Sequence, residues 1–296
     1  MNEYLPKISI VICAFNVSKL IKSILNSLKQ QTFQDFEVVI VNDGSTDDTS
    51  KVANEFGVSV GMGGVRVLDM PHQGLSATRN TGINNARADI VAIIDADCHA
   101  TENWLQEIYK KIEQNGETVV TGNTKIPKST FLGDCISGLG YPGGAHLGFE
   151  NMWPVSKEGY TNHLAGGNCA FRKEIIQNFG AFNPKLTITA DDVYLSMKIL
   201  ENQLKIKYNP KMIMYHPPRK DLKSFIHWHY TRGKGSYFFK KQVGSFNKFY
   251  KLRIWSTKNM IREYKTSPKL PVMLFLLGLS FATQKIGFVV QKVKVK

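Results

Sequence analysis

Buried strands and amphipathic helices alternate through the first 121 residues, and this alternation constrains the fold more than any other feature. Ile8–Ala14 is a continuous apolar run rich in β-branched residues, typical of a strand buried on both faces. Further strands are expected at Glu37–Val41, Val65–Leu68, Ile90–Ile94 and Thr118–Thr121. Helices are expected after Ser18, which serves as the cap of the first, and at 47–56, 76–86 and 102–114. This order predicts right-handed βαβ units and a Rossmann-like α/β fold with a mostly parallel central sheet.

Polar residues follow three of these predicted strands. Asn16 comes after the first strand, Asp43 after the second, and the Asp95-Ala96-Asp97 segment after the fourth. Parallel strands bring their carboxyl ends to one edge of a sheet, and sheets of this kind bind ligands there. We therefore expect these side chains to converge on one crevice.

The two carboxylates of Asp95 and Asp97 suggest a metal site. Mg²⁺ and Mn²⁺ prefer oxygen ligands, and a metal that also binds phosphates needs only one or two protein carboxylates. A pair with this spacing is common by chance, and the alternative is that the two acids cap the next helix. Their position after a buried strand, in line with Asp43, favours the metal.

A second acidic pair, Asp191-Asp192, begins the helix expected at Asp191–Asn202. Capping the free N–H groups of that helix explains one of the two acids. The functional interpretation is a general base that takes a proton from an alcohol. His216 follows a short strand expected at Ile206–Tyr208, and it is either a structural residue or a nitrogen ligand of the same metal.

Three cations are candidates for binding phosphate groups. Arg79 lies in the N-terminal half of a predicted helix, where it forms a surface salt bridge or contacts a phosphate or a base. Arg232 and Lys234 lie close together, where they can neutralise a departing diphosphate. Residues 122–189 are rich in glycine and aromatic residues, and we interpret them as loops around a site.

The cysteines and the N-terminus point to a reducing compartment. No pair of the four cysteines has the C-x-x-C spacing of a zinc site, so free thiols are the simpler interpretation. The first residues resemble no signal peptide. We therefore expect the body of the protein to stay in the cytoplasm.

The positive charge is confined to the C-terminal region. Residues 1–216 hold 20 Lys and Arg against 22 Asp and Glu, whereas residues 217–296 hold 18 against 2. The basic residues are interleaved with aromatic ones, a composition that suits an anionic membrane surface or single-stranded nucleic acid. We therefore divide the chain into a catalytic domain, residues 1–218, and a basic, aromatic and apolar helical region, residues 219–296.

An apolar segment in this region favours the membrane over nucleic acid. Pro271–Ala282 is almost wholly apolar, and after a polar break at 283–285 the apolar run continues at Ile286–Val290. A clean transmembrane helix needs about 20 apolar residues, so a buried core helix, a shallow or re-entrant membrane helix and a marginal single span all remain open. Lysines at both ends favour an interfacial hairpin over a single crossing.

Seven segments in order make the sequence similar to one known family. They cover about residues 8–217: Ile10–Asn16, Val41–Asp47, Gly74–Gly82, Ile94–Asp97, Gly166–Arg172, Asp191–Leu195 and His216-Pro217. On these segments the chain resembles the inverting family 2 glycosyltransferases with the GT-A fold. The resemblance implies an enzyme that moves a sugar from a UDP- or GDP-sugar to a hydroxyl group, with Mn²⁺ or Mg²⁺ as its cofactor.

The resemblance also implies roles for individual residues. Asp97 matches the metal ligand, Asp95 a contact with ribose or metal, and Asp192 the catalytic base, with Asp191 where Glu is usual. The residues that it assigns to the nucleotide-sugar are Ala14, Phe15, Asn16, Asp43, Arg79, Asp95, Ala96, Gly167 and Asn168, with Arg232 and Lys234 assisting the departing diphosphate. Two departures from the family pattern, Val17 and Tyr194, replace acids that are common there.

Three other functions fit the sequence less well. A nicotinamide-binding enzyme needs G-x-G-x-x-G after its first strand, and a haloacid-dehalogenase-type phosphatase places its acidic pair after the first strand. A non-enzymatic membrane or nucleic-acid adaptor explains the basic region but not the acids at the strand ends. We therefore expect a glycosyltransferase at the cytoplasmic face of a membrane, with a glycan or lipid-linked acceptor and no nucleic-acid partner.

Overall fold

The computed structural model describes residues 4–56, 60–140, 146–186 and 188–295. The chain forms two compact units. Unit 1 comprises Met1–Asn123, Val155–Thr187 and Asp191–Tyr215, and unit 2 comprises Thr124–Pro154, Ile188–Ala190 and His216–Lys296. The last boundary between the units, at Tyr215 and His216, lies close to the division expected at residue 218, but Thr124–Pro154 and Ile188–Ala190 also belong to unit 2.

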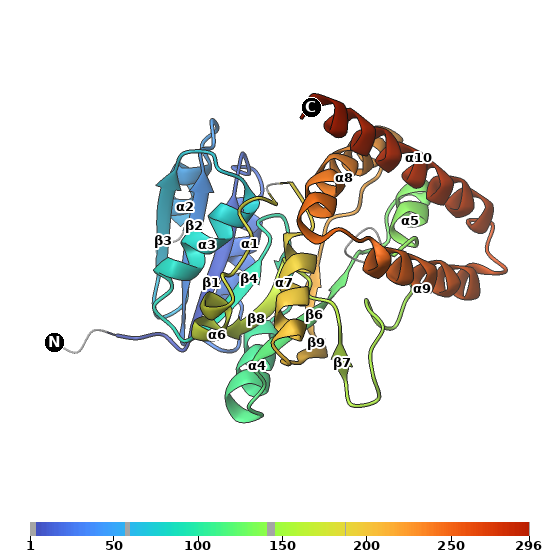
Figure 1. The fold of residues 1–296 in the computed structure, drawn as a ribbon. Helices are drawn as coiled ribbons and strands as arrows, with labels where there is room; N and C mark the ends of the chain where they lie inside the picture. The colour runs from blue at the N-terminus through green and yellow to red at the C-terminus, as the bar shows by residue number, and fades with distance from the viewer. Residues whose placement is uncertain (1–3, 57–59, 141–145, 187, 296) are drawn as a thin grey trace. The chain divides into compact units, whose positions relative to one another are not determined.

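Unit 1 is built on a nine-stranded sheet in the order β3-β2-β1-β4-β8-β6-β9-β5, with β7 paired to β9 (Figure 1). Its first half is parallel and consists of β1 (Ile8–Ala14), β2 (Phe36–Asp43), β3 (Val65–Met70) and β4 (Ile90–Ile94). These four strands confirm the predicted ones to within a few residues. Their carboxyl ends lie at one edge of the sheet, where Asp43 ends β2, and Asn16 and Asp95 follow β1 and β4.

The second half of the sheet is antiparallel. It consists of β5 (His99–Ala100), β6 (Val119–Lys125), β7 (Tyr160–Thr161), β8 (Asn168–Arg172) and β9 (Ile206–Tyr215). β8 runs antiparallel to both β4 and β6, and β9 runs antiparallel to β5 and β7. The sheet is therefore mixed, and the expectation of a mostly parallel sheet holds for its first half only. β8 corrects the interpretation of 122–189 as loops.

The helices of unit 1 follow the predicted order with shifted ends, apart from an unpredicted helix at Lys173–Asn178. They are α1 (Ile21–Lys29), α2 (Thr49–Phe56), α3 (Leu75–Asn85), α4 (Trp104–Tyr109), α6 (Lys173–Asn178) and α7 (Asp191–Glu201). A π-helical turn, η2 (Lys110–Gln114), continues α4. Ser18 does not cap α1, which begins after Leu20 and lacks a side-chain cap, because Ser18 lies in a turn held by Asp47.

The core of unit 1 lies on both faces of the sheet. Alternate residues of β1 belong to two clusters: Ile10 packs with Trp104 in one, and Val11 packs with Phe171 and Leu195 in the other. Successive side chains of a strand point to opposite faces, so a run without polar alternation has to be covered on both sides. This covering holds the strand ends in place.

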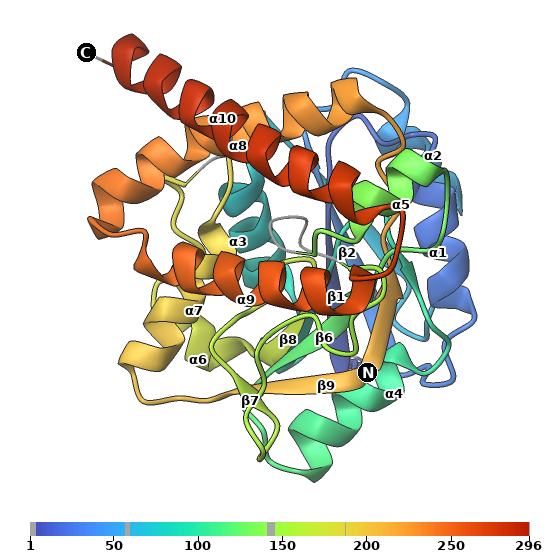
Figure 2. The ribbon, with the colours of Figure 1, turned by 90° about the vertical axis from the view of Figure 1, so that its right-hand side faces the viewer.

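Unit 2 is helical and consists of α5 (Phe131–Ser137), α8 (Leu222–Val243), α9 (Asn247–Tyr264) and α10 (Leu270–Lys294) (Figures 1 and 2). α10 packs along α8 through glycines: a Cβ at Gly233 would overlap the backbone of Gln284, and a Cβ at Gly287 would overlap that of Tyr230. The Gln284 side chain also hydrogen-bonds to His229 at 2.7 Å.

α10 is one uninterrupted helix of 25 residues, so residues 271–290 do not form the expected hairpin. The polar segment 283–285 does not break it, because Thr283 and Gly287 lie on the buried side of α10 while Gln284 bonds to α8. Among the described residues α10 is the one helix long and apolar enough to cross a membrane, with a mean hydropathy of 1.7.

Candidate active site at the strand ends

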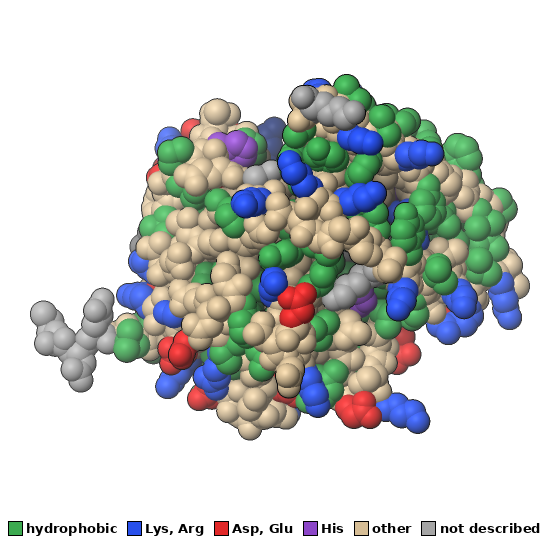
Figure 3. Space-filling model, viewed as in Figure 1, with side chains coloured by type: hydrophobic (Ala, Val, Ile, Leu, Met, Phe, Trp, Pro, Cys, Tyr) green, Lys and Arg blue, Asp and Glu red, His purple; other side chains and the backbone are tan. Residues whose placement is uncertain are grey.

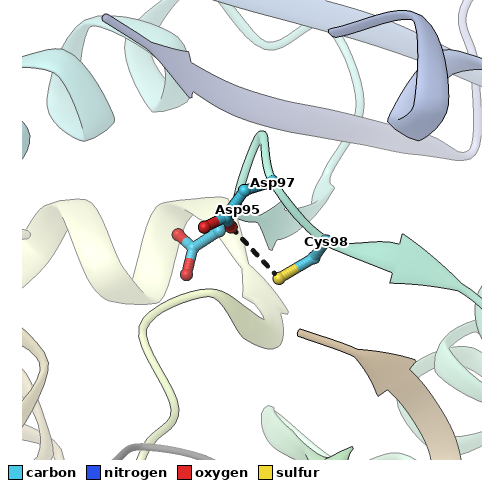
Figure 4. Close-up of side chains that lie close together, drawn as sticks. All are labelled: Asp95, Asp97 and Cys98. Atoms are coloured by element: carbon cyan, nitrogen blue, oxygen red, sulfur yellow. Dashed lines mark hydrogen bonds between the residues drawn. The ribbon is translucent and has the colours of Figure 1, made fainter. Parts of the chain in front are cut away.

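Asp95 and Asp97 lie in the tight turn that follows β4, together with Cys98 (Figure 4). Their ligand atoms lie within 4.8 Å of one another, and the Cys98 thiol donates a hydrogen bond to Asp97 Oδ1 at 3.4 Å. Burial strongly raises the pKa of the Cys98 thiol, and Mg²⁺ and Mn²⁺ prefer oxygen to sulfur, so the thiol is the weakest of the three candidate ligands. The two carboxylates that remain are the oxygen donors that Mg²⁺ and Mn²⁺ prefer, so the donor set fits such an ion.

Two glycines before β8 leave space for the acidic groups. A Cβ at Gly167 would lie 2.6 Å from Asp95 Oδ1 and closer still to Oδ2. A Cβ at Gly166 would lie 2.8 Å from Arg79 Nη1 and 3.0 Å from the Cβ of Asp192. Distances below 3.0 Å do not occur for real Cβ atoms, so glycine is required at both positions if these side chains are to stay where they are.

Arg79 bridges two of the acids from α3. Its Nη1 lies 2.6 Å from Asp191 Oδ2 and its Nη2 3.5 Å from Asp95 Oδ1, while its side chain is 4% exposed. Burial alone lowers the pKa of Arg79, but the carboxylates of Asp191 and Asp95 outweigh it and the pKa is raised. The guanidinium is therefore charged and holds the two acids in place. The predicted contact of Arg79 with a nucleotide stays a prediction.

The two acids at the start of α7 lie in different surroundings. Asp191 is buried in its ion pair with Arg79 and lies 3.5 Å from Ser76 Oγ. Asp192 is half-buried, and its carboxylate accepts hydrogen bonds from Gly166 N at 3.4 Å and from Val193 N at 2.7 Å. The first acid is therefore a structural partner, whereas the second keeps an accessible carboxylate.

The residue before this pair has an unusual backbone. Ala190 adopts the left-handed region, with φ of 70°. A residue with a Cβ reaches this region at a cost of about 1–3 kcal/mol, and such strain clusters at functional sites. The strained residue directly precedes Asp191 and Asp192. A strained backbone at this position agrees with a site in which the two carboxylates need fixed orientations.

Asp43 is almost fully enclosed at the end of β2. Its carboxylate accepts hydrogen bonds from Gln73 N at 2.8 Å and Gly74 N at 3.0 Å, and it lies 2.9 Å from His72 Nδ1. The His72 ring stacks on Phe15, which is 46% exposed, with 4.5 Å between the ring centroids. Phe15 and His72 thus form an exposed aromatic surface above Asp43. His72 was missed because the predicted strand ended at Leu68, whereas β3 extends to Met70, two residues before His72.

Other predicted nucleotide contacts have structural partners. Asn16 has a left-handed backbone, φ 54°, and its side chain accepts a hydrogen bond from Thr46 N at 2.9 Å, which ties the loop after β1 to the loop after β2. Asn168 is fully buried between Trp104 Nε1 and Met212 O, at 2.9 and 3.3 Å. This corrects the prediction for Asn168, whose side chain lies in the core and offers no surface to a ligand. Ala14 and Ala96 are also buried.

Three predicted site residues belong to unit 2. His216 Nδ1 lies 2.7 Å from Pro217 O. The guanidinium of Arg232 lies 4.8 Å from the centre of the Trp228 ring, and Lys234 Nζ lies 4.7 Å from that of Tyr230. The predicted roles of His216 at the metal and of the two cations at the diphosphate stay predictions.

Comparison with known proteins identifies the family. Residues 9–179 match Glycosyl transferase family 2. Glycosyltransferase AglE of Haloferax volcanii is 26% identical over 226 residues, 74% of this chain and 69% of that protein. The glucosyl-dolichyl phosphate glucuronosyltransferase of the same organism is 24% identical over 192 residues, 60% of this chain and 56% of that protein. For four other relatives, the match to this chain covers only 16% to 38% of the relative's own length.

Solved structures confirm the fold. The mannosyltransferase PcManGT of Pyrobaculum calidifontis, in complex with GDP-Man and Mn²⁺, matches 99% of this chain and 85% of its own with a TM-score of 0.59. At 17% identity this likeness shows the fold alone, which is the GT-A fold expected from the sequence. The family match covers more than half of the chain, and the protein therefore belongs to glycosyl transferase family 2.

Proposed function

We propose that this protein transfers a sugar from a nucleotide-sugar to a hydroxyl group with inversion at the anomeric carbon, and that Asp192 is the catalytic base. The observation that carries the proposal is the shared centre at Arg79. This residue pairs with Asp95 on one side and Asp191 on the other, while Asp192 stands next to it at Gly166 with an accessible carboxylate. One buried cation thus holds a donor-binding acid, Asp95, to the residue directly before the proposed base, an arrangement that suits a one-step displacement.

In this mechanism Asp192 takes the proton of the acceptor hydroxyl. The hydroxyl oxygen forms a bond to the anomeric carbon as the bond from that carbon to the diphosphate breaks, and the nucleoside diphosphate leaves with the electron pair. Gly166 N and Val193 N orient the Asp192 carboxylate. A divalent cation held by Asp95 and Asp97 would neutralise the charge that grows on the diphosphate. General base catalysis of this kind contributes about 10²–10⁴-fold.

We assign the base of the nucleotide to the aromatic surface of Phe15 and His72. An aromatic base stacks on such a surface through its flat face, whichever hydrogen-bonding groups it carries at its edge. Asp43 supports the surface from below through His72. This arrangement suits both uridine and guanosine, and the structural relative PcManGT was solved with GDP-Man.

The donor is identified by a screen. The full-length protein is incubated with Mn²⁺ and a panel of UDP- and GDP-sugars, and release of the nucleoside diphosphate is measured. We expect one sugar to be turned over well above the others. Thermal unfolding in UDP or GDP with Mn²⁺ provides the second readout, because a ligand bound by the folded state raises its stability. Stabilisation by RNA or by lipid, with none from any nucleotide, would instead support the adaptor.

We also propose that unit 2 lies against the cytoplasmic face of a membrane and that the acceptor is lipid-linked or a polysaccharide. Only 28% of the most apolar stretch of α10 is buried. The exposed apolar residues of this helix include Leu274, Phe275, Phe281, Ile286, Val289 and Val293. Apolar and basic side chains gather over α8 and α10 in Figure 3. One relative is named for a glucosyl-dolichyl phosphate, a lipid-linked compound.

The packing of α10 favours a helix that lies in the membrane interface. Its buried side is apolar in the first half, at Met273 and Leu276, and small or polar in the second half, where Gly287 and Gln284 contact α8. A helix held along its length by such contacts exposes its opposite face to the acyl chains, while lysines at its ends reach the headgroups.

Flotation with anionic vesicles tests this assignment. We expect the wild-type protein to float with vesicles and Phe275→Glu combined with Val289→Glu to stay at the bottom of the gradient, because two charges are placed on the exposed apolar face. Leu5→Glu is the matched control, since Leu5 is 66% exposed and Phe275 65%. Flotation that the double variant leaves unchanged would refute the role of α10.

A further inference from the structure

Unit 2 contains a cavity of about 570 Å³ between its helices. A volume of this size lies within the range of about 300–1,000 Å³ found for small-molecule sites. Aromatic rings from two elements form its walls: Phe246 and Phe249 come from the start of α9, and Phe281 and Phe288 from α10. The ring of Phe246 lies 6.2 Å from Phe249 and 6.1 Å from Phe288, centre to centre. The wall is therefore suited to an apolar group.

Cations surround this apolar wall. Arg232 and Lys240 of α8, Arg253 of α9 and Lys285 of α10 line the cavity, and no Asp or Glu is among the described residues that line it. The Arg253 guanidinium lies 3.8 Å from the centre of the Phe281 ring. Lys240 Nζ lies 5.9 Å from the centre of the Phe288 ring. The ligand that this charge complements is an anion with an apolar body.

The position of the cavity in the chain connects it with the proposed reaction. Thr189 and Ala190 line it, and the next residues are Asp191 and Asp192. One wall of the cavity is therefore joined to the acidic pair by a single peptide bond, between Ala190 and Asp191. Gly235 of α8 lets this wall pack closely against the helix, because a Cβ there would lie 3.3 Å from the Cβ atoms of Ile188 and Thr189.

The cavity also lies on the helix that we assign to the membrane. Phe281 and Phe288 line it from α10, and Phe281 and the neighbouring Ile286 and Val289 are exposed large apolar residues. A chain of methylene groups can therefore pass from a bilayer into the cavity along apolar surface. A free sugar or a soluble nucleotide gains nothing from such a path.

We propose that this cavity binds a phosphate ester of a long apolar chain, and that this is how the protein holds its acceptor. The apolar chain packs among the four phenylalanine rings, and the phosphate lies between Lys240, Lys285 and the two arginines. The inference rests on the proposed transferase function, which it extends by naming the class of acceptor. Two sources share this chemistry: isoprenoid phosphates and phosphates of straight acyl or alkyl chains.

Equilibrium dialysis of the full-length protein, without donor or metal, measures binding directly. The probes are radiolabelled farnesyl phosphate and dodecyl phosphate, with farnesol and inorganic phosphate as partial ligands. We expect at least one of the two alkyl phosphates to bind much more tightly than either partial ligand. The tighter of the two identifies the source. Binding of neither, or binding no tighter than that of inorganic phosphate, overturns the proposal.

Charge variants locate the phosphate. Lys240→Gln combined with Lys285→Gln should weaken alkyl phosphate binding by about tenfold or more, since each lysine can donate a charge-assisted hydrogen bond to the phosphate. The matched control is Lys241→Gln with Lys292→Gln, two exposed lysines of the same helices that do not line the cavity. An equal loss in the control pair would mean that general positive charge attracts the probe, and the proposal would fall.

A steric variant locates the apolar chain. Ala282 is exposed and lines the cavity, so Ala282→Trp should fill it and abolish binding of the alkyl phosphate. Gly278→Trp, one turn earlier on α10 where a Cβ meets open space, should leave binding intact. Nucleotide-sugar turnover to water is measured in parallel. In the wild-type protein, intact turnover without alkyl phosphate binding refutes the cavity proposal alone, whereas absent turnover with every nucleotide-sugar refutes the proposed function; binding that survives Ala282→Trp refutes the cavity as the site.

Discussion

Gly167→Ala adds one methyl group and should weaken metal binding at Asp95 and Asp97 without unfolding the protein. The new Cβ would lie 2.6 Å from Asp95 Oδ1 and closer to Oδ2, so the carboxylate must leave its position. The Asp95 side chain is 41% exposed and can turn toward solvent, whereas the backbone has no need to move. The substitution therefore separates the position of one carboxylate from the stability of the fold.

The magnitude follows from the contacts that change. The Arg79–Asp95 pair at 3.5 Å is lost, but with one partner partly exposed it contributes under about 1 kcal/mol. Replacing glycine by alanine returns about 0.4–1 kcal/mol through the unfolded chain, so the free energy of unfolding should barely change. Altering the groups around a bound metal lowers its affinity by about 10–100-fold. We expect the affinity for Mn²⁺ to fall by at least this factor. That loss corresponds to about 1.4–2.8 kcal/mol.

Free Mn²⁺ measured by electron paramagnetic resonance during a titration gives the affinity, and urea unfolding gives the stability. Gly278→Ala is the control, because its new Cβ meets nothing within 4 Å. We expect the control to bind Mn²⁺ like the wild type. Unchanged Mn²⁺ affinity in a folded Gly167→Ala protein would show that the Asp95 carboxylate does not bind the metal.

Two further predictions concern stability. Arg79→Met leaves Asp191 buried without its cation, and since breaking such a buried pair costs about 3–5 kcal/mol, urea unfolding should show a loss of that size; a loss below about 1 kcal/mol would contradict the bridging role. In unit 2, burial alone raises the pKa of Asp134, but Lys269 at 2.6 Å and Ser129 N outweigh it and the pKa is lowered. The stabilisation by this pair should therefore be present above about pH 4, the range of an ordinary Asp, and disappear as the pH falls through the lower folded value. Hydrogen exchange at the start of α10 should show this loss in the wild type, and Asp134→Asn should remove the pH dependence.

The sequence predicts the first half of the fold well because the physics there is local. A strand buried on both faces has to be apolar throughout, so β1 and β4 are visible as runs, and the acids that follow them mark the carboxyl ends. β8 was missed because its signal is weaker: Asn168 begins it, and two glycines precede it. Only the tertiary pairing of β8 with β4 and β6 shows that Asn168 has a place in the core.

The site was predicted in its residue types but not in its connections. Asp95, Asp97 and Asp192 were singled out by their places after a strand and at the start of a helix, and their roles stay predictions. That Arg79 binds Asp191 and Asp95, which are 96 residues apart in the chain, follows from packing that no local pattern records. The same holds for α10, which continues through a polar segment because α8 supplies partners for it.

The most direct measurement of the central claim is the turnover of Asp192→Asn with the donor found by the screen. The substitution keeps the size of the side chain and removes its capacity to accept a proton. We predict that kcat falls by about 10²–10⁴-fold while nucleotide affinity and thermal stability stay near those of the wild type. Turnover within a few-fold of the wild type would contradict the assignment of Asp192 as the base.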